Sequence, residues 1–526
     1  MKVTSHVVQL TKRKIVGRMG TCVLAVLALP GSTGWTLETP APIRVSTDGH
    51  FLMQADGHPF FWLSDAAWSL ATRSKRDEAE VYLKDRAAKG FTVMAVEVMA
   101  YAAADGTWNR SGNAANAYGA QPFVDGDFGR PNELYFQYID WVIDRAEYYG
   151  LRVALVPVWG LWTVTNGKMT VAQAETYGRW LGARYKGKAV IWMLGGDLTP
   201  LWRSSSSTVE PPGTTLVDYR PHFDAMARGI AAGETGHPLI TYHIACCNWP
   251  GTASARTSLY FSDRPWLTIN YVQLTSFRDL ATIRKATGFA QSWISGYEYE
   301  PIAEEYRSLP PRPVISADPK AEDIPFDADL LPPEQVNYGD RVTAKDVRFY
   351  AYESVFSGAA GAGYNHNSLT GFFDPTRAKP VTGERSSWRD ALDAPGAGQM
   401  SFVKALMLSR PYFTRIPDQS VVRGDAGEGI AHIAATRDRS GSYIMIYLPA
   451  GQSVNVEMAK LAGSFAKGWW YDTRTGKAIS IPETIPTNQD HRFVPPVTDT
   501  AVDWVLVVDD ATRNFPSPGS HLTEIK

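Results

Sequence analysis

Cysteine is scarce in this chain, with three residues in 526. Cys246 and Cys247 are adjacent, and a vicinal pair rarely forms a disulfide because the bridge is strained. So few cysteines exclude a disulfide framework and a CxxC zinc pattern. We therefore interpret Cys246 and Cys247 as two small buried thiols.

An excess of charge of one sign is also missing. The chain has 52 Lys and Arg against 54 Asp and Glu, a formal net charge of −2. Without a basic excess to neutralise phosphates, a general nucleic-acid binder is excluded. Hydrophobic residues make up 44% and charged residues 20%, which excludes bulk disorder and collagen-like structure. Aromatic residues are abundant, as in many sugar-binding clefts, although core packing explains most of them.

Long hydrophobic runs are absent except near the N-terminus. The stretch 19–29 is apolar, four basic residues lie between positions 12 and 18, and small residues follow at 31–34. The stretch is too short for an ordinary transmembrane helix. The pattern predicts a signal peptide over residues 1–38, and hence a secreted or periplasmic protein with no stable membrane insertion after cleavage. The alternative is a disordered N-terminal tail.

From about residue 50, apolar β-like runs alternate with helical patterns. Eight β runs fall at 60–63, 91–99, 151–159, 189–194, 238–244, 267–274, 312–317 and 359–364. The helical patterns include 76–89, 132–149, 171–185, 217–232, 277–286, 344–357 and 388–409. This alternation predicts an α/β fold, a (β/α)8 TIM barrel over residues 39–411. A doubly wound open sheet alternates too, but no Gly-rich phosphate-binding fingerprint follows the first run.

After about residue 412 the pattern changes to short β runs separated by turns. These runs lie at 429–436, 442–448, 453–457, 468–472 and 504–508. No long helical pattern interrupts them. Residues 412–526 are therefore predicted to form a small C-terminal antiparallel β-sandwich.

Active groups of a TIM barrel lie at the C-terminal ends of its strands. The polar and aromatic candidates at these ends are Asp65, Trp68, Glu97, Trp159, Trp162, Asp197, His243, Gln273, Asp318, Tyr364 and His366. Glycoside hydrolysis needs this combination, because two carboxyl groups act across the scissile bond while polar and aromatic groups hold the sugar.

Asp197 and Asp318 are the predicted catalytic pair. Asp197 follows an apolar strand and two glycines, which permit a sharp turn close to a ligand. Asp318 follows the seventh strand, on the opposite side of the barrel. Glu322, four residues later, is an alternative to Asp318. The other candidates are predicted to contact the substrate, with a structural role left open for Asp65, Glu97 and His243.

Motifs for other chemistries are missing. There is no HExxH motif and no EF-hand loop, so no metal site is predicted. There is also no GxSxG elbow with the spacing of a nucleophilic serine. Two-carboxylate hydrolysis requires no cofactor, and none is expected.

Several segments together resemble the apiosidase-like glycoside hydrolases. They include FFWLSDAAWSL (60–70), RPNELYFQYIDWVIDRA (130–146), IWMLGGD (191–197), AYESVFSGAAGAGY (351–364), WWYDTRTGKA (469–478) and DWVLVVDD (503–510). The resemblance covers roughly residues 48–510. It implies a (β/α)8 catalytic domain followed by a β-sandwich labelled as collagen-binding. It also implies that Asp197, in the GGD motif, is the general acid/base.

The sequence departs from this family at the expected nucleophile. The family pattern is PV-x-x-x-E-P, whereas residues 313–319 read PVISADP, with Asp318 in place of Glu. A side chain one methylene shorter sets its carboxylate about 1 Å further back, a misplacement that costs about 10²-fold in rate. The strand-1 motif at 64–68 and the segment 273–276 also differ. These changes suggest a specificity that has moved away from apiose.

The sequence thus predicts a glycoside hydrolase that cleaves a sugar, such as a furanoside, from an oligo- or polysaccharide. One alternative is a carbohydrate-binding protein that has lost catalysis through Asp318. Another is an adhesion protein whose β-sandwich binds a protein partner. The identity of the sugar, the linkage, the stereochemical outcome and the oligomeric state stay open.

Overall fold

The structure, a computed structural model, describes residues 40–99, 113–203, 216–245, 256–273, 297, 299–326, 328 and 336–520. The chain divides into two units, Met1–Leu37 and Glu38–Lys526, and everything below concerns the second. The expected signal peptide and the helical pattern at 277–286 lie outside the described residues. Within the described part, no helix has both the length and the apolar character needed to cross a membrane.

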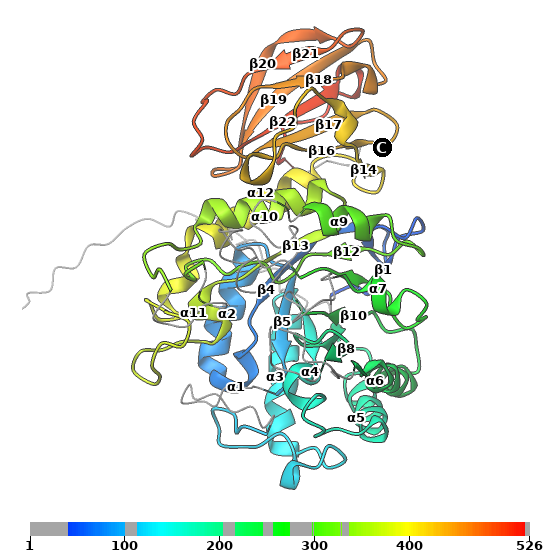
Figure 1. Ribbon diagram of the computed structural model, residues 1–526, viewed down its shortest axis with the longest axis vertical. Helices are drawn as coiled ribbons and strands as arrows, with labels where there is room; N and C mark the ends of the chain where they lie inside the picture. Colours follow the sequence, from blue (N-terminus) through cyan, green and yellow to red (C-terminus); the bar gives the residue numbers. More distant parts are fainter. Residues whose placement is uncertain are drawn as a thin grey trace, which may run out of the picture. The chain divides into compact units, whose positions relative to one another are not determined.

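Eight parallel strands form the barrel, coloured from blue to green in Figure 1. They are β4 (Trp62–Ala66), β5 (Val93–Glu97), β6 (Arg152–Val156), β7 (Val190–Gly195), β10 (Ile240–His243), β11 (Asn270–Tyr271), β12 (Val314–Ile315) and β13 (Gly361–Tyr364). Six of them form one sheet in the order β10-β7-β6-β5-β4-β13, and β11 pairs with β12. Backbone bonds from Thr268 to Ile240 (2.9 Å) and from Ala360 to Val314 (2.8 Å) connect the two sets.

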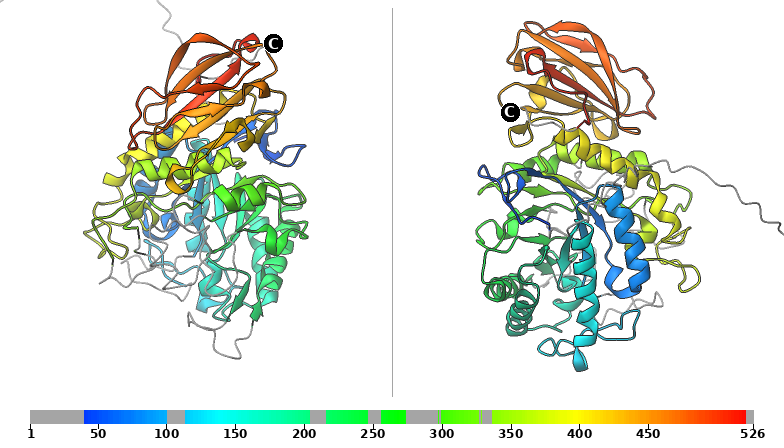
Figure 2. Two further views of the ribbon diagram at one scale, coloured as in Figure 1. Left: turned by 45° about the horizontal axis from the view of Figure 1, so that its top comes forward. Right: turned by 180° about the vertical axis from the view of Figure 1, so that it is seen from behind.

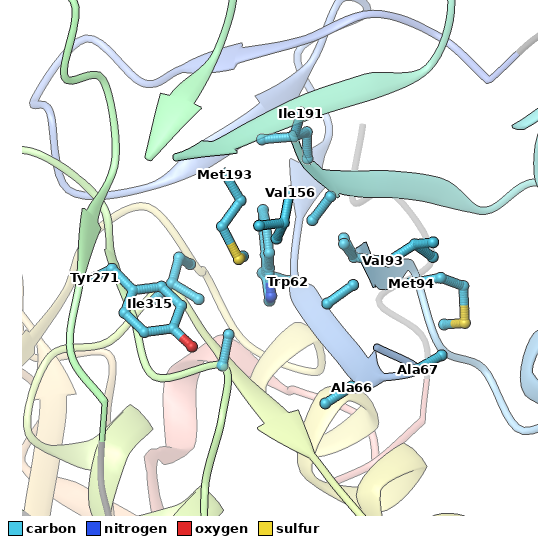
Figure 3. Close-up of a cluster of buried hydrophobic side chains, with 14 of the residues drawn as sticks. Trp62, Ala66, Ala67, Val93, Met94, Val156, Ile191, Met193, Tyr271 and Ile315 are labelled. Carbon is cyan, nitrogen blue, oxygen red and sulfur yellow. The ribbon is translucent and has the colours of Figure 1, made fainter. Parts of the chain in front are cut away.

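The barrel interior is filled by large apolar side chains. Figure 3 shows Trp62, Val156, Met193 and Ile315 close together there, with the ring of Tyr271 beside them. Every residue of β5 and β6 is buried, because helices cover the outer face of the sheet while side chains fill the inner one. This double burial explains why the strands read as continuous apolar runs.

Helices lie outside the strands. The helices of eight or more residues are α2 (Arg76–Ala88), α3 (Glu133–Tyr148), α5 (Val171–Arg184), α6 (Arg220–Glu234), α9 (Tyr299–Tyr306), α10 (Ala344–Phe356) and α12 (Pro395–Leu408). Short helices are α1 (Leu70–Arg73), α4 (Gly160–Thr163), α7 (Ser258–Phe261) and α11 (Asn367–Thr370). Figure 2, seen from behind, shows α2 and α3 side by side. The Asn132 side chain caps α3 by accepting from the Leu134 amide, and a Thr170–Gln173 capping box starts α5.

The C-terminal part is an antiparallel β-sandwich, as predicted. Its larger sheet has the order β14-β16-β17-β22-β19-β20, and its smaller sheet β15-β18-β21. The strands are β14 (Arg415–Pro417), β15 (Val422–Arg423), β16 (Ala434–Asp438), β17 (Tyr443–Leu448), β18 (Val454–Val456), β19 (Phe465–Asp472), β20 (Lys477–Pro486), β21 (His491–Phe493) and β22 (Trp504–Asp510). Side chains of both sheets share one core.

Some strands are not anticipated by the sequence patterns. The antiparallel sheet β1 (Ile43–Val45), β2 (Leu52–Gln54) and β3 (Pro59–Phe60) precedes the barrel, and β8 (Leu201–Arg203) pairs with β9 (Leu216–Asp218). β20 is ten residues long but mostly exposed and contains two prolines, so its sequence lacks the apolar alternation of a strand. It lies at the edge of its sheet, where proline is tolerated.

Buried polar contacts join α10 to the β-sandwich. Arg348 forms a bidentate ion pair with Asp503, at 2.9 and 2.6 Å. Glu353, fully buried, lies 2.8 Å from Nδ1 of His432. Since α10 leads into β13 from the N-terminal side of that strand, these contacts lie at the end of the barrel opposite to the predicted active groups.

Candidate active site

Asp197 lies on a tight turn directly after β7. Gly195, Gly196 and Asp197 all have positive φ angles, of 92°, 93° and 45°. A Cβ atom on Gly195 would lie 2.4 Å from the carbonyl oxygen of His243, and one on Gly196 would lie 2.9 Å from Cα of Trp159. Glycine is therefore required twice, both for the backbone angles and for space. The turn leaves the Asp197 side chain 38% exposed.

Asp318 follows β12 and is held by three donors. Its Oδ2 accepts from Nε2 of Gln273 at 3.2 Å and lies 3.3 Å from Nε2 of His243. Its Oδ1 accepts from Nδ2 of Asn365 at 3.0 Å. Only 11% of the side chain is exposed. A group surrounded by donors suits the acceptor-only chemistry of an ionised carboxylate.

His243 links the two carboxylates, and its contacts assign its tautomer. Its Nδ1 lies 3.2 Å from the backbone nitrogen of Asp197, which is a donor. Nδ1 must therefore be the unprotonated acceptor, so in the neutral ring the proton is on Nε2 and points to Asp318. The ring is completely buried.

Gln273 donates to both catalytic candidates from one nitrogen atom. Its Nε2 lies 3.1 Å from Oδ1 of Asp197 and 3.2 Å from Oδ2 of Asp318. The two hydrogens of an amide nitrogen diverge by about 120°, so these two oxygens lie about 5.5 Å apart. That spacing matches the separation of about 5–5.5 Å in retaining glycosidases rather than the 6.5–9.5 Å of inverting ones.

Aromatic rings form one wall beside this pair. The Trp68 ring lies edge-on to Trp159 and to His243, with centroids 5.4 and 5.1 Å apart. Trp68 and Trp159 are buried and Trp162 is half-buried. These rings brace His243, and Trp162 is the most accessible of the three predicted platform residues.

Glu97 faces the barrel interior. In the register of β4 and β5, Asp65 pairs with Met94 and Asp65 points outward to α2, so the alternate residues Ala95 and Glu97 point inward. Glu97 is completely buried, and neither carboxyl oxygen has a partner in the described part of the chain. Burial, reinforced by the charge of Asp197, raises the pKa of Glu97 well above its usual range. A neutral carboxyl group beside Asp197 follows.

Asp65 and Tyr364 do not face the cleft. They pair in register across β4 and β13 and point toward the helices. Asp65 accepts from Nε of Arg86 at 2.5 Å and from the Tyr82 hydroxyl at 2.9 Å, and it is completely buried. The Arg86 guanidinium also lies 5.8 Å from the Tyr364 ring. These contacts make Asp65 and Tyr364 part of the packing between the barrel and α2.

His366 caps a helix. Its Nδ1 accepts from the Ser368 amide at 3.1 Å, at the start of α11. Burial lowers the pKa of His366 to about 4, so the ring is neutral near pH 7. The structure does not bring it to the Asp197–Asp318 pair.

Glu322 has both carboxyl oxygens engaged. Oε2 accepts from the Tyr364 hydroxyl at 2.7 Å and Oε1 from the Gly396 amide at 3.2 Å. Burial raises the pKa of Glu322, while these two donors oppose the rise. Its carboxylate therefore faces the first turn of α12.

Two residues of the site escaped sequence reasoning. Asn365 binds Asp318, and its own Oδ1 accepts from the Thr370 hydroxyl at 2.5 Å. The hydroxyl of Tyr271 is buried without a partner among the described residues, and burial, with the charges of Asp318 and Asp197, raises its pKa far above the usual value. Both lie at strand ends, so the signal was present, but it did not distinguish them from their neighbours.

Within the described ranges, no group of three or more His, Cys, Asp or Glu residues is arranged to hold a metal ion. The chemistry that the site offers is that of two carboxylates at short range with neutral donors around them. This is the arrangement that glycosidic bond cleavage uses.

Comparison with known proteins agrees with this geometry. The sequence profile "Apiosidase-like, catalytic domain" matches residues 46–414, and the profile "Putative collagen-binding domain of a collagenase" matches residues 416–509. A solved structure described as a glycoside hydrolase is 30% identical, with 90% of this chain and 98% of the other covered, at a TM-score of 0.74.

A glycoside hydrolase family 5 structure from Bacteroides vulgatus is 29% identical, with 91% and 95% of the two chains covered, at a TM-score of 0.77. No curated protein matches the chain. The first profile spans well over half of the sequence and agrees with the fold and with the paired carboxylates. The chain belongs to the apiosidase-like family and is a glycoside hydrolase.

Proposed function

We propose that this glycoside hydrolase is a secreted or periplasmic enzyme that removes a sugar, of furanoside type, from an oligo- or polysaccharide with retention of configuration. The observation that carries the proposal is the donor shared by Asp197 and Asp318, which keeps two carboxylate oxygens about 5.5 Å apart. The resemblance of residues 1–38 to a signal peptide supports export.

In the first step, Asp318 attacks the anomeric carbon while the glycosidic C–O bond breaks. The carboxyl group of Asp197 donates its proton to the departing oxygen, and a glycosyl ester forms on Asp318. Asp197 is the more exposed carboxylate of the pair, as expected for the group that must reach a leaving alcohol.

In the second step, the Asp197 carboxylate takes a proton from water as the water oxygen attacks the anomeric carbon. The ester bond breaks and Asp318 is released as a carboxylate. The donors from Gln273, His243 and Asn365 stabilise Asp318 when it regains its charge.

The shorter side chain of Asp318 favours a second candidate function, a carbohydrate-binding protein without turnover. The donors around Asp318 argue for the enzyme, because they hold its carboxylate in one place despite the missing methylene. A carboxylate kept only for binding does not need a second carboxylate at 5.5 Å.

The test uses 2,4-dinitrophenyl furanosides of apiose, arabinose and galactose together with plant polysaccharides. We expect the wild-type protein to release sugar from at least one of them, and Asp318→Asn to lower the rate about 10³-fold or more. Saturable glycan binding by the wild-type protein with no product at any concentration would favour the binding-only function instead.

A further inference from the structure

Glu322 sits where two loops of the candidate site meet. One loop runs from Asp318 to Glu322, and the other runs from Asn365 to Asn367 after β13. The Glu322 amide donates to the carbonyl of Asn365 at 2.8 Å, and the amide of Asn367 donates to the carbonyl of Glu322 at 2.9 Å. These bonds form an isolated parallel bridge between Glu322 and His366.

The side chain of Glu322 fixes this bridge to the barrel. Tyr364, on the last barrel strand, donates to Oε2 at 2.7 Å. Gly396, in the first turn of α12, donates its backbone N–H to Oε1 at 3.2 Å. That amide is one of the N–H groups that a helix start leaves without an intrahelical partner, and a carboxylate at this end is favoured by the helix dipole.

The second loop returns to the catalytic candidate. Asn365, whose carbonyl accepts from the Glu322 amide, donates its side-chain amide to Oδ1 of Asp318 at 3.0 Å. Asp318, Glu322 and Asn365 thus form a closed ring of covalent and hydrogen bonds. Moving the Glu322 backbone moves both the loop that carries Asp318 and the donor that orients its carboxylate.

Space around the Glu322 carboxylate is tight. A Cβ atom on Gly396 would lie 2.4 Å from Oε2 of Glu322 and 3.2 Å from a ring carbon of Tyr364. Two residues later in the same helix, a Cβ atom on Gly398 would meet nothing within 4 Å. The carboxylate is therefore held by contact as well as by hydrogen bonds.

We propose that Glu322 is a positioning residue that fixes Asp318 by clamping the loops 318–322 and 365–367 to α12. The proposal rests on the function proposed above for Asp318. It assigns the second acidic residue of this loop to placing the shorter nucleophile, a duty that a chain with Asp in place of Glu has particular need of. Glu322 does not touch the substrate.

Five variants test the clamp. Glu322→Ala removes both side-chain bonds, Glu322→Gln keeps the shape and can keep both, and Gly396→Ala displaces the carboxylate from the side of α12. Gly398→Ala is the matched control in the same helix. Glu353→Ala is the control for loss of a buried, hydrogen-bonded glutamate at the other end of the barrel.

Hydrogen–deuterium exchange of the full-length protein gives a readout without any substrate. We expect Glu322→Ala and Gly396→Ala to speed exchange in peptides covering 318–326 and 361–370, whereas Glu322→Gln and both controls leave these peptides unchanged. Unchanged exchange in Glu322→Ala would overturn the clamp. The outcome holds whether or not a sugar substrate has been found.

Turnover of a dinitrophenyl furanoside gives the second readout. We expect Glu322→Ala to lower kcat about 10²-fold at a nearly constant KM, in line with a displacement of about 1 Å. Glu322→Gln should restore kcat to within a few fold, which a nucleophile could not do. Glu353→Ala should lower the melting temperature without this loss of kcat.

A trapped intermediate separates the two proposals. A 2-deoxy-2-fluoro furanoside that labels Asp318 in the wild-type protein supports the clamp, and a label on Glu322 overturns it. If Asp197→Asn and Asp318→Asn both retain full turnover while Glu322→Ala speeds loop exchange and lowers kcat, the proposed catalytic pair fails, and with it the clamp's proposed service to Asp318.

Discussion

Asp197 and Asp318, on opposite sides of the barrel, share a single hydrogen-bond donor, the amide nitrogen of Gln273. Because one nitrogen reaches both carboxylates, their separation is fixed by the length of two hydrogen bonds. The missing methylene of Asp318 has therefore not widened the gap to the range of inverting enzymes.

This spacing predicts hydrolysis with retention of configuration. Proton NMR during the first minutes of turnover of a dinitrophenyl furanoside should show a product with the anomeric configuration of the substrate, before mutarotation mixes the two forms. The physical reason is that a gap of about 5.5 Å admits the sugar carbon but leaves no room for a water molecule behind it. An initial product of the opposite anomer would contradict the prediction.

Asp197→Asn removes the proton donor without changing the backbone preference. Asp197 has φ of 45°, and both Asp and Asn tolerate this left-handed region. We expect kcat/KM to fall about 10²–10⁴-fold for a substrate with a poorly leaving alcohol. The loss should be smaller for dinitrophenolate, because that group departs without a proton.

Asp125→Asn is the control for Asp197→Asn. Asp125 has φ of 55° and a side chain that is 79% exposed, paired only with Arg130. The same chemical change at a left-handed residue away from the site should leave kcat/KM and the melting temperature nearly unchanged. Equal losses in the two variants would assign the effect on Asp197 to folding and not to proton transfer.

Gly196→Ala should cost more stability than Gly57→Ala, although both glycines have φ of 93°. The shared penalty for Ala at positive φ is about 1–2 kcal/mol. At Gly57 nothing lies within 4 Å of the added Cβ, whereas at Gly196 it would lie 2.9 Å from Cα of Trp159 and 3.0 Å from the Gly160 nitrogen. Urea unfolding measures the difference, and equal free energies of unfolding would disprove the steric contribution.

The strands that carry the catalytic candidates were predictable because each is a continuous apolar run with polar residues at its C-terminal end. The turn at Asp197 was predictable too, since two successive glycines indicate a sharp turn. The strand-end rule places a residue at one edge of the sheet. It does not state whether a side chain points into the barrel or out to the helices.

That orientation explains the differences at β13. Tyr364, Asn365 and His366 are consecutive, yet only Asn365 binds Asp318, while Tyr364 points to Glu322 and His366 caps α11. A shift of one residue in the strand boundary reverses the assignment, because side chains alternate between faces. Sequence patterns locate strand ends to within a few residues, so the choice among these three required the structure.

His366 predicts a specific loss of stability in acid. Its pKa is lowered to about 4 in the folded protein, because burial disfavours the charged ring, and is about 6.5 when unfolded. Between these values the unfolded chain binds more protons, so the free energy of unfolding falls as pH drops below about 6.5 and the loss is complete near pH 4. At pH 4.5 this one residue accounts for about 2.5 kcal/mol.

His366→Asn separates this titration from the helix cap. The Asn side chain can still accept from the Ser368 amide at the start of α11, but it does not take up a proton. Urea unfolding at pH 7 and at pH 4.5 should therefore show a smaller acid-induced loss for His366→Asn than for the wild-type protein, by about 2.5 kcal/mol. If the two proteins lose equal free energy of unfolding over this range, His366 is not a buried neutral ring in the folded state, and other groups must account for the acid sensitivity.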